Sequence, residues 1–311
     1  MIAHLKGREK ALEAFGWTGR EAEWVALACL HSGVFTRDQL SDWLGIHRRS
    51  ARRFIRDMTD RRMASMDRLA GRRVCRIYAR AVYRALGAED IRHRRIASVP
   101  VLLRRLLSLD YVMGHTGQVW LPTEPEKVGA FEALGIERAL LPVRVYRGGG
   151  GNTRRHFPLK LPVALDAKGA VFVYADPGHE TATGLQHWGR THQELWGALR
   201  DRGLPVEAVA VVLGDGEFDR AENVLANWTS PVRSSGRLKA SATGREIRRD
   251  IERIEQGIRG RNECVIGEHG SLRGCLVRLA ELRAALPTAP SEAMIDGFTV
   301  WRSSRLSGDV F

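Results

Sequence analysis

The chain has few cysteines and no long apolar run. Its four cysteines, at positions 29, 75, 264 and 275, stand far apart among 311 residues and form no C-x-x-C motif. This pattern excludes a disulfide framework, and we expect reduced thiols in a cytoplasmic protein. The longest apolar runs are as short as residues 209–213, far below the ~20 residues that cross a bilayer. The first ten residues contain no apolar signal segment, so we expect neither export nor a membrane partner.

The standard phosphate-binding loops are also absent. Residues 148–151 are four glycines, and Arg154 and Arg155 follow shortly after them. Their spacing matches neither G-x-G-x-x-G nor a Walker A loop. Such a stretch can cradle a phosphate, but a surface loop is the simpler interpretation. We predict no bound cofactor.

Positive charge is concentrated in the first third of the chain. Residues 1–105 contain 23 Lys and Arg against 11 Asp and Glu, whereas the remaining 206 residues contain 26 against 25. A genome-wide bias toward arginine would act along the whole chain. A field confined to one region instead indicates a polyanionic partner, most commonly nucleic acid.

Three helices are expected within this basic region. The first spans residues 18–32, with Thr18 as its N-cap and Glu21 as the capping-box partner. The second begins after Thr36, Gly45 makes a tight turn, and the third spans about residues 47–61. Two short helices separated by such a turn are typical of a helix-turn-helix.

The third expected helix has two distinct faces. At helical spacing Ala51, Phe54, Ile55 and Met58 share an inward side. The arginines project away from it, where a guanidinium can grip phosphate or recognise guanine. A solvated charged face is the alternative. The predicted DNA-contacting residues of this helix are Arg48, Arg49, Ser50, Arg52, Arg53 and Arg56.

Two short strands, residues 63–69 and 74–79, are expected to flank a turn at residues 71–73. Arg72 and Arg73 would then reach DNA from the tip of a wing. The segment LSDWLGIHRRSARRFIRDM, residues 40–58, resembles the winged helix-turn-helix of bacterial and plasmid regulators, and the resemblance spans residues 19–87. It implies binding of double-stranded DNA, usually by a homodimer.

A longer helix is expected over residues 91–109, kinked or split by Pro100. It would join two domains or form a dimer surface. From residue 111 onward, short strands alternate with helices, which indicates a mixed α/β layer. The expected fold class is therefore α+β, with an N-terminal winged helix-turn-helix, a mixed α/β domain and a C-terminal helical segment.

The α/β region carries two acidic residues at the ends of successive expected strands, Asp166 and Asp176. This order resembles the PD-(D/E)XK nuclease core, which implies a divalent metal held by paired carboxylates. The position of the catalytic lysine is occupied by Gly178, so the resemblance implies a degenerate nuclease fold and no enzyme activity. If cleavage remained, Asp166, Asp176 and Glu180 would hold the metal.

Together, the two halves resemble the replication-relaxation family over residues 19–228. This resemblance implies DNA handling on plasmids and integrative elements. A helical stripe containing Trp188, His192 and Trp196 is interpreted as core rather than as a metal site.

We divide the chain into a winged helix-turn-helix domain (1–90), a connecting helix (91–110), a nuclease-like domain (111–230) and C-terminal helices with a last strand (231–311). Isoleucines 247, 251, 254 and 258 form a narrow stripe in the last region, which suits packing on the same chain or on a second subunit. The predicted function is sequence-specific binding of double-stranded DNA as a transcriptional regulator, with the second domain serving dimerisation or sensing a ligand or protein. The alternatives are a Mg²⁺-dependent nuclease and an accessory protein of plasmid replication or conjugation.

Overall fold

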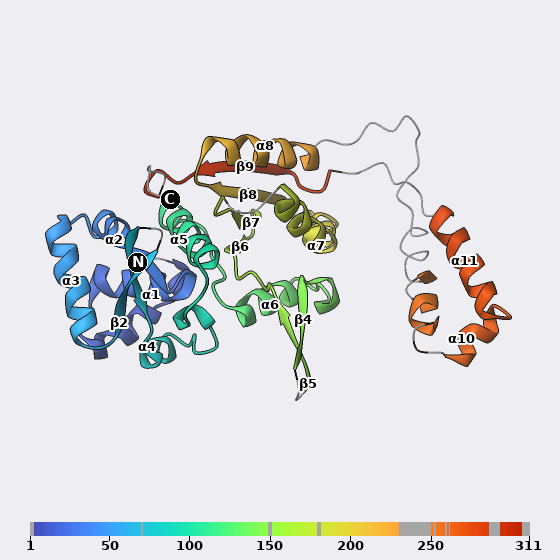
Figure 1. The fold of residues 1–311 in the computed structure, drawn as a ribbon, viewed down its shortest axis with the longest axis horizontal. Helices are drawn as coiled ribbons and strands as arrows, with labels where there is room; N and C mark the ends of the chain where they lie inside the picture. Colours follow the sequence, from blue (N-terminus) through green and yellow to red (C-terminus); the bar gives the residue numbers. More distant parts are fainter. Residues whose placement is uncertain are drawn as a thin grey trace. The chain divides into compact units, whose positions relative to one another are not determined.

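The computed structural model describes residues 3–69, 71–148, 151–178, 182–229, 250–251, 253–258, 260, 262–285 and 293–306. By internal contacts the chain forms two units: unit 1 is Met1–Thr229 with Met294–Phe311, and unit 2 is Ser230–Ala293. Helices and several sheets are mixed in unit 1 (Figure 1), which confirms the α+β class at that level. In the part of the chain that the structure describes, no helix combines the length and apolarity needed to cross a membrane.

The N-terminal part of unit 1 alternates helices with three short strands. The hydroxyl oxygen of Thr36 accepts a hydrogen bond from the backbone N–H of Gln39, and the side-chain oxygen of Gln39 accepts one from the backbone N–H of Thr36. This capping box starts α2. Thr18 is the N-cap residue of α1 but makes no side-chain capping bond, so the expected pairing with Glu21 is wrong. The elements are the 3-10 helices η1 (Ala3–Leu5), η2 (Arg8–Phe15) and η3 (Arg92–Arg94), helices α1 (Gly19–His31), α2 (Arg37–Leu44), α3 (Arg48–Asp60) and α4 (Arg80–Ala85), and strands β1 (Val34–Thr36), β2 (Ala64–Leu69) and β3 (Arg72–Ile77).

The three strands form an antiparallel sheet in the order β1-β3-β2. Phe35 and Met66 lie on either side of Cys75 in the register. Gly33 makes the turn from α1 into β1 at φ 75°, where a side chain would collide with the backbone of His93. The sheet and α1 to α4 share one apolar core, which contains Trp24, Phe35 and Tyr83.

A central helix, α5 (Val99–Gly114), follows with Pro100 in its first turn. The expected helix over residues 91–109 is therefore split before Pro100, and its earlier part contains only η3. Helix α5 contacts α1 and β1 on the N-terminal side of the chain and β7 and β8 of the second sheet. It is buried almost continuously from Leu102 to Met113, so it joins the two parts of one chain rather than presenting a dimer surface.

The second sheet has four strands in the order β6-β7-β8-β9. Strands β6 and β7 are antiparallel, whereas β7, β8 and β9 are parallel. The elements after α5 are α6 (Glu124–Ala133), η4 (Arg138–Leu140), a separate hairpin of β4 (Val143–Gly148) and β5 (Gly151–His156), then β6 (Val163–Asp166), β7 (Gly169–Ala175), α7 (Ala182–Arg200), β8 (Val206–Val212), α8 (Asp215–Thr229) and β9 (Gly297–Arg302).

The placement of β9 differs from the expected domain division. The last strand was expected among the C-terminal helices of residues 231–311, yet it pairs with β8 from Glu207↔Gly297 to Val212↔Arg302. The chain leaves unit 1 after α8 and returns to complete its sheet (Figure 1). Unit 2 is thus inserted in the chain between α8 and β9 of unit 1.

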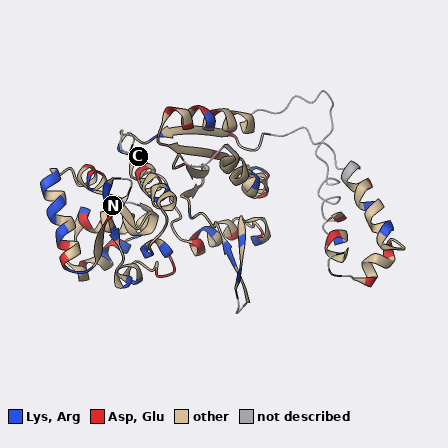
Figure 2. Ribbon diagram, viewed as in Figure 1, with Lys and Arg blue, Asp and Glu red and all other residues tan. Residues whose placement is uncertain are grey.

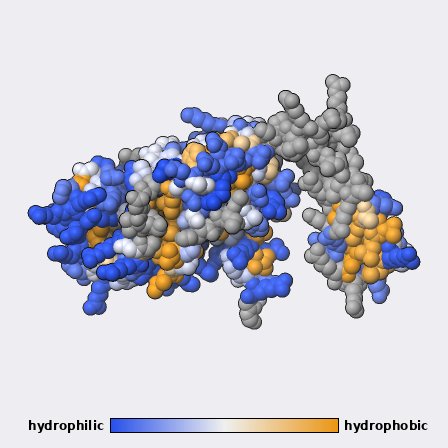
Figure 3. Space-filling model, turned by 45° about the horizontal axis from the view of Figure 1, so that its top comes forward, coloured by the Kyte–Doolittle hydropathy of each residue, from blue (hydrophilic) through white to orange (hydrophobic). Residues whose placement is uncertain are grey.

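Unit 2 contains α10 (Glu263–Glu268), α11 (Leu272–Ala285) and a helical stretch within residues 250–258. Ile254 packs with Cys275, Leu279 and Leu282 in a small cluster that Ile251 and Ile258 also join. The isoleucine stripe therefore packs on its own chain, while Ile247 lies outside the described residues. Leu272, Leu276 and Val277 of α11 are about half exposed, and Figure 3 shows a hydrophobic patch on this unit.

Candidate nucleic-acid interface

Helix α3 is anchored by one face. Ala51, Ile55 and Met58 are buried and Phe54 packs partly against the same core, as their helical spacing predicts. Gly45, at φ 66°, ends α2 and turns the chain toward α3. The ring nitrogen Nδ1 of His47 then accepts a hydrogen bond from the backbone of Arg49 at 3.2 Å. The turn, the cap and the buried face fix the orientation of the opposite face.

That opposite face is lined with guanidinium groups, and we call it the arginine face: Arg48, Arg49, Arg52, Arg53 and Arg56. All five are exposed, and Ser50 beside them is half-buried. Figure 2 shows these basic residues along α3, and the same end of unit 1 is mostly hydrophilic in Figure 3. Among the described residues, no acidic side chain forms an ion pair with any of the last four arginines.

Two acidic residues near α3 form ion pairs. Asp38 pairs with Arg48 at 3.1 Å and with Arg37 at 3.5 Å. At the other end of the helix, Asp57 pairs with Arg61 at 3.2 Å. Arg61 also lies 5.4 Å from the centre of the Trp17 ring, which ties the end of α3 to the N-terminal segment. Arg48 is thus the one member of the arginine face whose charge is partly neutralised within the described structure.

The hairpin of β2 and β3 adds two exposed arginines. Arg68 and Arg73 face each other across the hairpin in the antiparallel register, and both are exposed. Arg72 was expected at the tip, but it is half-buried and donates a hydrogen bond to the carbonyl oxygen of Arg305 at 3.4 Å. Of the two arginines predicted at the tip, Arg73 is exposed and Arg72 is half-buried. Arg68, which the sequence pattern did not single out, is the exposed residue opposite Arg73 in the register.

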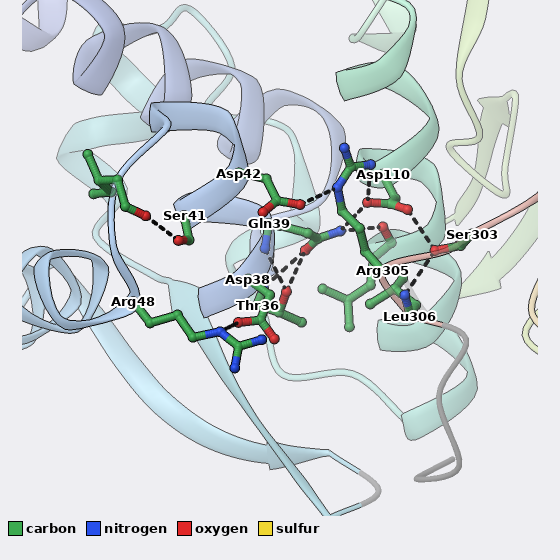
Figure 4. A network of polar contacts seen from close by, with 12 residues as sticks. Thr36, Asp38, Gln39, Ser41, Asp42, Arg48, Asp110, Ser303, Arg305 and Leu306 are labelled. Carbon is green, nitrogen blue, oxygen red and sulfur yellow. Dashed lines mark hydrogen bonds and ion pairs between the residues drawn. The ribbon is translucent and has the colours of Figure 1, made fainter.

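A buried polar network holds α2 to α5 and to the segment after β9 (Figure 4). Asp110 accepts a hydrogen bond from the hydroxyl of Ser303 at 2.6 Å and from Gln39 of α2 at 3.4 Å. Arg305 joins Asp110 at 3.3 Å and Asp42 of α2 at 2.8 Å. Burial raises the pKa of Asp110, although its partners Ser303 and Arg305 act to lower it. The network fixes α2, and so α3, against the rest of unit 1.

The acidic residues of the nuclease-like pattern do not meet. Asp166 pairs in the register with Gly169 at one end of β7, whereas Asp176 follows the other end of that strand. Seven residues of extended chain separate these ends by roughly 20 Å. Each carboxylate instead accepts a hydrogen bond from a nearby backbone amide, that of Lys168 or Gly178. Glu180 lies outside the described residues, and among those described no three acidic, histidine or cysteine side chains form a metal-binding group.

The glycine-rich segment belongs to a second basic element. Gly148 and Gly151 end the paired region of the β4–β5 hairpin, where Arg144 pairs in register with Arg155. Arg155 lies 3.4 Å from Glu124, and Arg144 lies over the ring of Tyr146. The hairpin is a ribbon with little burial rather than an irregular loop.

The aromatic stripe of α7 is core, as predicted. Trp188, His192 and Trp196 are buried, and the Nδ1–H of His192 donates a hydrogen bond to the carbonyl oxygen of Trp188 at 2.8 Å. Burial lowers the pKa of His192 to about 4, so this ring is neutral at physiological pH.

Comparison of the chain with protein-family models, with curated proteins and with solved structures gives no match.

Proposed function

We propose that the chain binds double-stranded DNA in a sequence-specific manner and regulates transcription on a plasmid or another mobile element. In this proposal α2 and α3 form the helix-turn-helix, β2 and β3 form the wing, and α3 enters the major groove. The arginine face is the observation that supports the proposal most directly. It presents four exposed guanidinium groups without acidic partners among the described residues, on a helix whose other face is buried.

The electrostatics of this face favour a polyanion. Arg49 and Arg53 are four residues apart, as are Arg52 and Arg56, so each pair repels across one helical turn. Phosphates convert that repulsion into attraction and release counterions from DNA. A major groove accommodates an α-helix, and an arginine fork matches the two acceptors of guanine. The same residues can therefore supply both affinity and base recognition.

The wing has a separate role in the proposal. Arg68 and Arg73 are register partners, so their side chains lie on the same face of the β2–β3 hairpin. They belong to a different element from the arginine face. Contacts of such arginines with phosphate or the minor groove position a recognition helix without specifying sequence. The ion pair between Arg76 and Asp67, at 2.7 Å, braces the hairpin from its other face.

A homodimer is part of the proposal, because helix-turn-helix proteins commonly recognise two half-sites. The mixed α/β part would serve assembly or sensing. The resemblance to the replication-relaxation family agrees with this arrangement, and an accessory function in plasmid replication or conjugation is the alternative use of the same DNA binding. Mapping bound sites to promoters or to an origin separates the two.

The decisive experiment measures binding to duplexes selected by the protein from a random-sequence pool. In fluorescence anisotropy, Arg49→Gln/Arg52→Gln/Arg53→Gln should weaken binding by at least ~100-fold, because each arginine contributes about 1–3 kcal/mol. The slope of log K against log salt should also become shallower by about 0.9 for each phosphate that the variant no longer neutralises. The matched control is Arg138→Gln/Arg190→Gln/Arg220→Gln, which removes the same charge from exposed positions on other elements.

Equal affinities of the arginine-face variant and the wild type would refute the proposal. The nuclease alternative is tested in the same samples by adding Mg²⁺ or Mn²⁺. We expect intact DNA, because Asp166 and Asp176 lie at opposite ends of β7. Cleavage that disappears in Asp176→Asn would favour the nuclease instead.

A further inference from the structure

A cavity of about 560 Å³ lies in the α/β part of unit 1, away from the arginine face. Its walls come from α7, from strands β6 and β7, from the start of β4 and from residues 157–161. A volume of this size matches pockets that hold small organic ligands. Neither the DNA-binding proposal nor the nuclease pattern uses these residues.

The interior of the cavity is aromatic. Phe157, Tyr174, Trp188 and His192 line it, and all four are buried. The Trp188 and His192 rings are 4.8 Å apart between centres, and the Phe157 and His192 rings are 6.3 Å apart. At these separations the rings pack on one another and form a continuous aromatic wall, against which a flat ligand could stack.

The charged side chains that line the cavity are positive. Arg144 and Lys160 are exposed lining residues, and no Asp or Glu is among the described lining residues. Partial desolvation and the positive charges of Arg105, Arg92 and Arg155 together lower the pKa of Lys160 to about 8. The surroundings of the opening are therefore electropositive and favour a ligand that brings negative charge.

The segment at residues 157–161 is held in an unusual conformation. Phe157 and Lys160 have φ of 48° and 56°, and they are two of the four non-glycine residues with positive φ in the described structure. Such conformations cost about 1–3 kcal/mol each and occur often at ligand sites. The buried Nζ of Lys127, on α6, donates a hydrogen bond to the carbonyl oxygen of Leu161 at 2.6 Å and lies 5.6 Å from the centre of the Phe157 ring. The core thus holds the strained wall in place.

We propose that this cavity binds an aromatic organic anion, with its ring against the aromatic wall that contains Phe157 and Trp188 and its acidic group beside Arg144 and Lys160. The inference stands apart from DNA binding, because it uses other residues and is measured without DNA. An anion at this site would join the hairpin start, the strained segment and α7, three elements that converge on the cavity.

The test is isothermal titration calorimetry of the full chain with three probes of similar shape: naphthoate, naphthylmethanol and naphthylmethylammonium. We expect naphthoate to bind with a Kd of about 10–100 µM and the alcohol about tenfold more weakly, with no detectable binding of the ammonium. Arg144→Gln/Lys160→Gln should weaken naphthoate binding about tenfold and leave binding of the alcohol unchanged. Unchanged alcohol binding also shows that the variant is folded.

Two further variants locate the site. Thr191→Trp places a large ring at an exposed lining position of α7 and should abolish binding of naphthoate and the alcohol. Arg190→Gln is the matched control, since this exposed neighbour does not line the cavity. Equal binding of the three probes, failure of naphthoate to bind at about 1 mM, or binding that survives in Thr191→Trp would overturn the proposal.

Discussion

Helix α3 and the β4–β5 hairpin are both rich in arginine, yet they hold it in different ways. On α3 the cations share one face and the opposite face is buried. On the hairpin they alternate between the two sides of a thin ribbon, and Arg155 is paired with Glu124. The number of arginines is therefore a poor guide to an interface. A packed element that gathers unpaired cations on one side is the stronger indication.

Charge reversal gives the largest expected difference between the two elements. Arg52→Glu/Arg53→Glu should lower DNA affinity by more than ~100-fold, because it replaces two attractive contacts with two repulsive ones. Arg147→Glu/Arg154→Glu on the hairpin should lower it by less than ~5-fold, through long-range repulsion alone. Anisotropy at two salt concentrations measures both. Equal decreases in affinity from the two variants would show that the hairpin is also part of the interface and would end the distinction.

Anchoring is the second point of contrast. Ile55 is 6% exposed, whereas Val145 on the hairpin is 47% exposed. Ile55→Ala should lower the free energy of unfolding by about 2–4 kcal/mol, and Val145→Ala should change it by less than about 0.5 kcal/mol. Chemical denaturation followed by circular dichroism gives both values. A small effect of Ile55→Ala would mean that the buried face of α3 does not secure the helix.

Sequence patterns anticipated α3 well because its causes are local. Helical spacing predicted that Ala51 and Ile55 face inward, and Gly45 indicated the turn before the helix. The expected limits of α3, residues 47–61, differ from the observed ones by one residue at each end. The hairpin of β2 and β3 was anticipated in outline, but the direction of Arg72 depends on Arg305, which is distant in the sequence.

Contacts between distant segments explain the other differences. Nothing in the sequence near residues 297–302 shows that this strand pairs in parallel with β8, or that Arg305 then reaches Asp42. The prediction that Asp166 and Asp176 lie close together is wrong for a related reason. Asp166 ends β6 and Asp176 follows β7, but these two strands are antiparallel. Their carboxyl ends therefore point in opposite directions, and the two aspartates lie at opposite ends of the strands.

Acid provides a test of whether the two regions unfold together. His31 at the end of α1 and His192 of α7 are both buried, and burial holds the pKa of each below the ordinary value of 6.5. The unfolded chain therefore binds more protons below pH 6.5, and stability falls as the pH decreases toward about 4. DNA binding and the tryptophan fluorescence of the folded state should disappear at the same pH, since both regions belong to unit 1.

The control for this experiment is His192→Gln. Removing one buried histidine should lower the slope of unfolding free energy against pH by about 1 kcal/mol per pH unit between pH 6 and 4.5. A wild type whose stability is constant over that interval would contradict the neutral, buried state of His192. A fluorescence change well before the decline of DNA binding would instead separate the two regions into independent folding units.

The smallest expected effect lies within the arginine face itself. Arg48 already pairs with Asp38, whereas Arg52 has no such partner in the described structure. A contact from Arg48 to DNA must replace that ion pair, so Arg48→Gln should weaken binding only about 2-fold, against about 10-fold for Arg52→Gln. Asp38→Asn frees Arg48 and removes a negative charge, and it should strengthen binding about 2-fold. Weaker binding of Asp38→Asn in the same anisotropy assay would show that this ion pair orients α3 rather than competing with DNA.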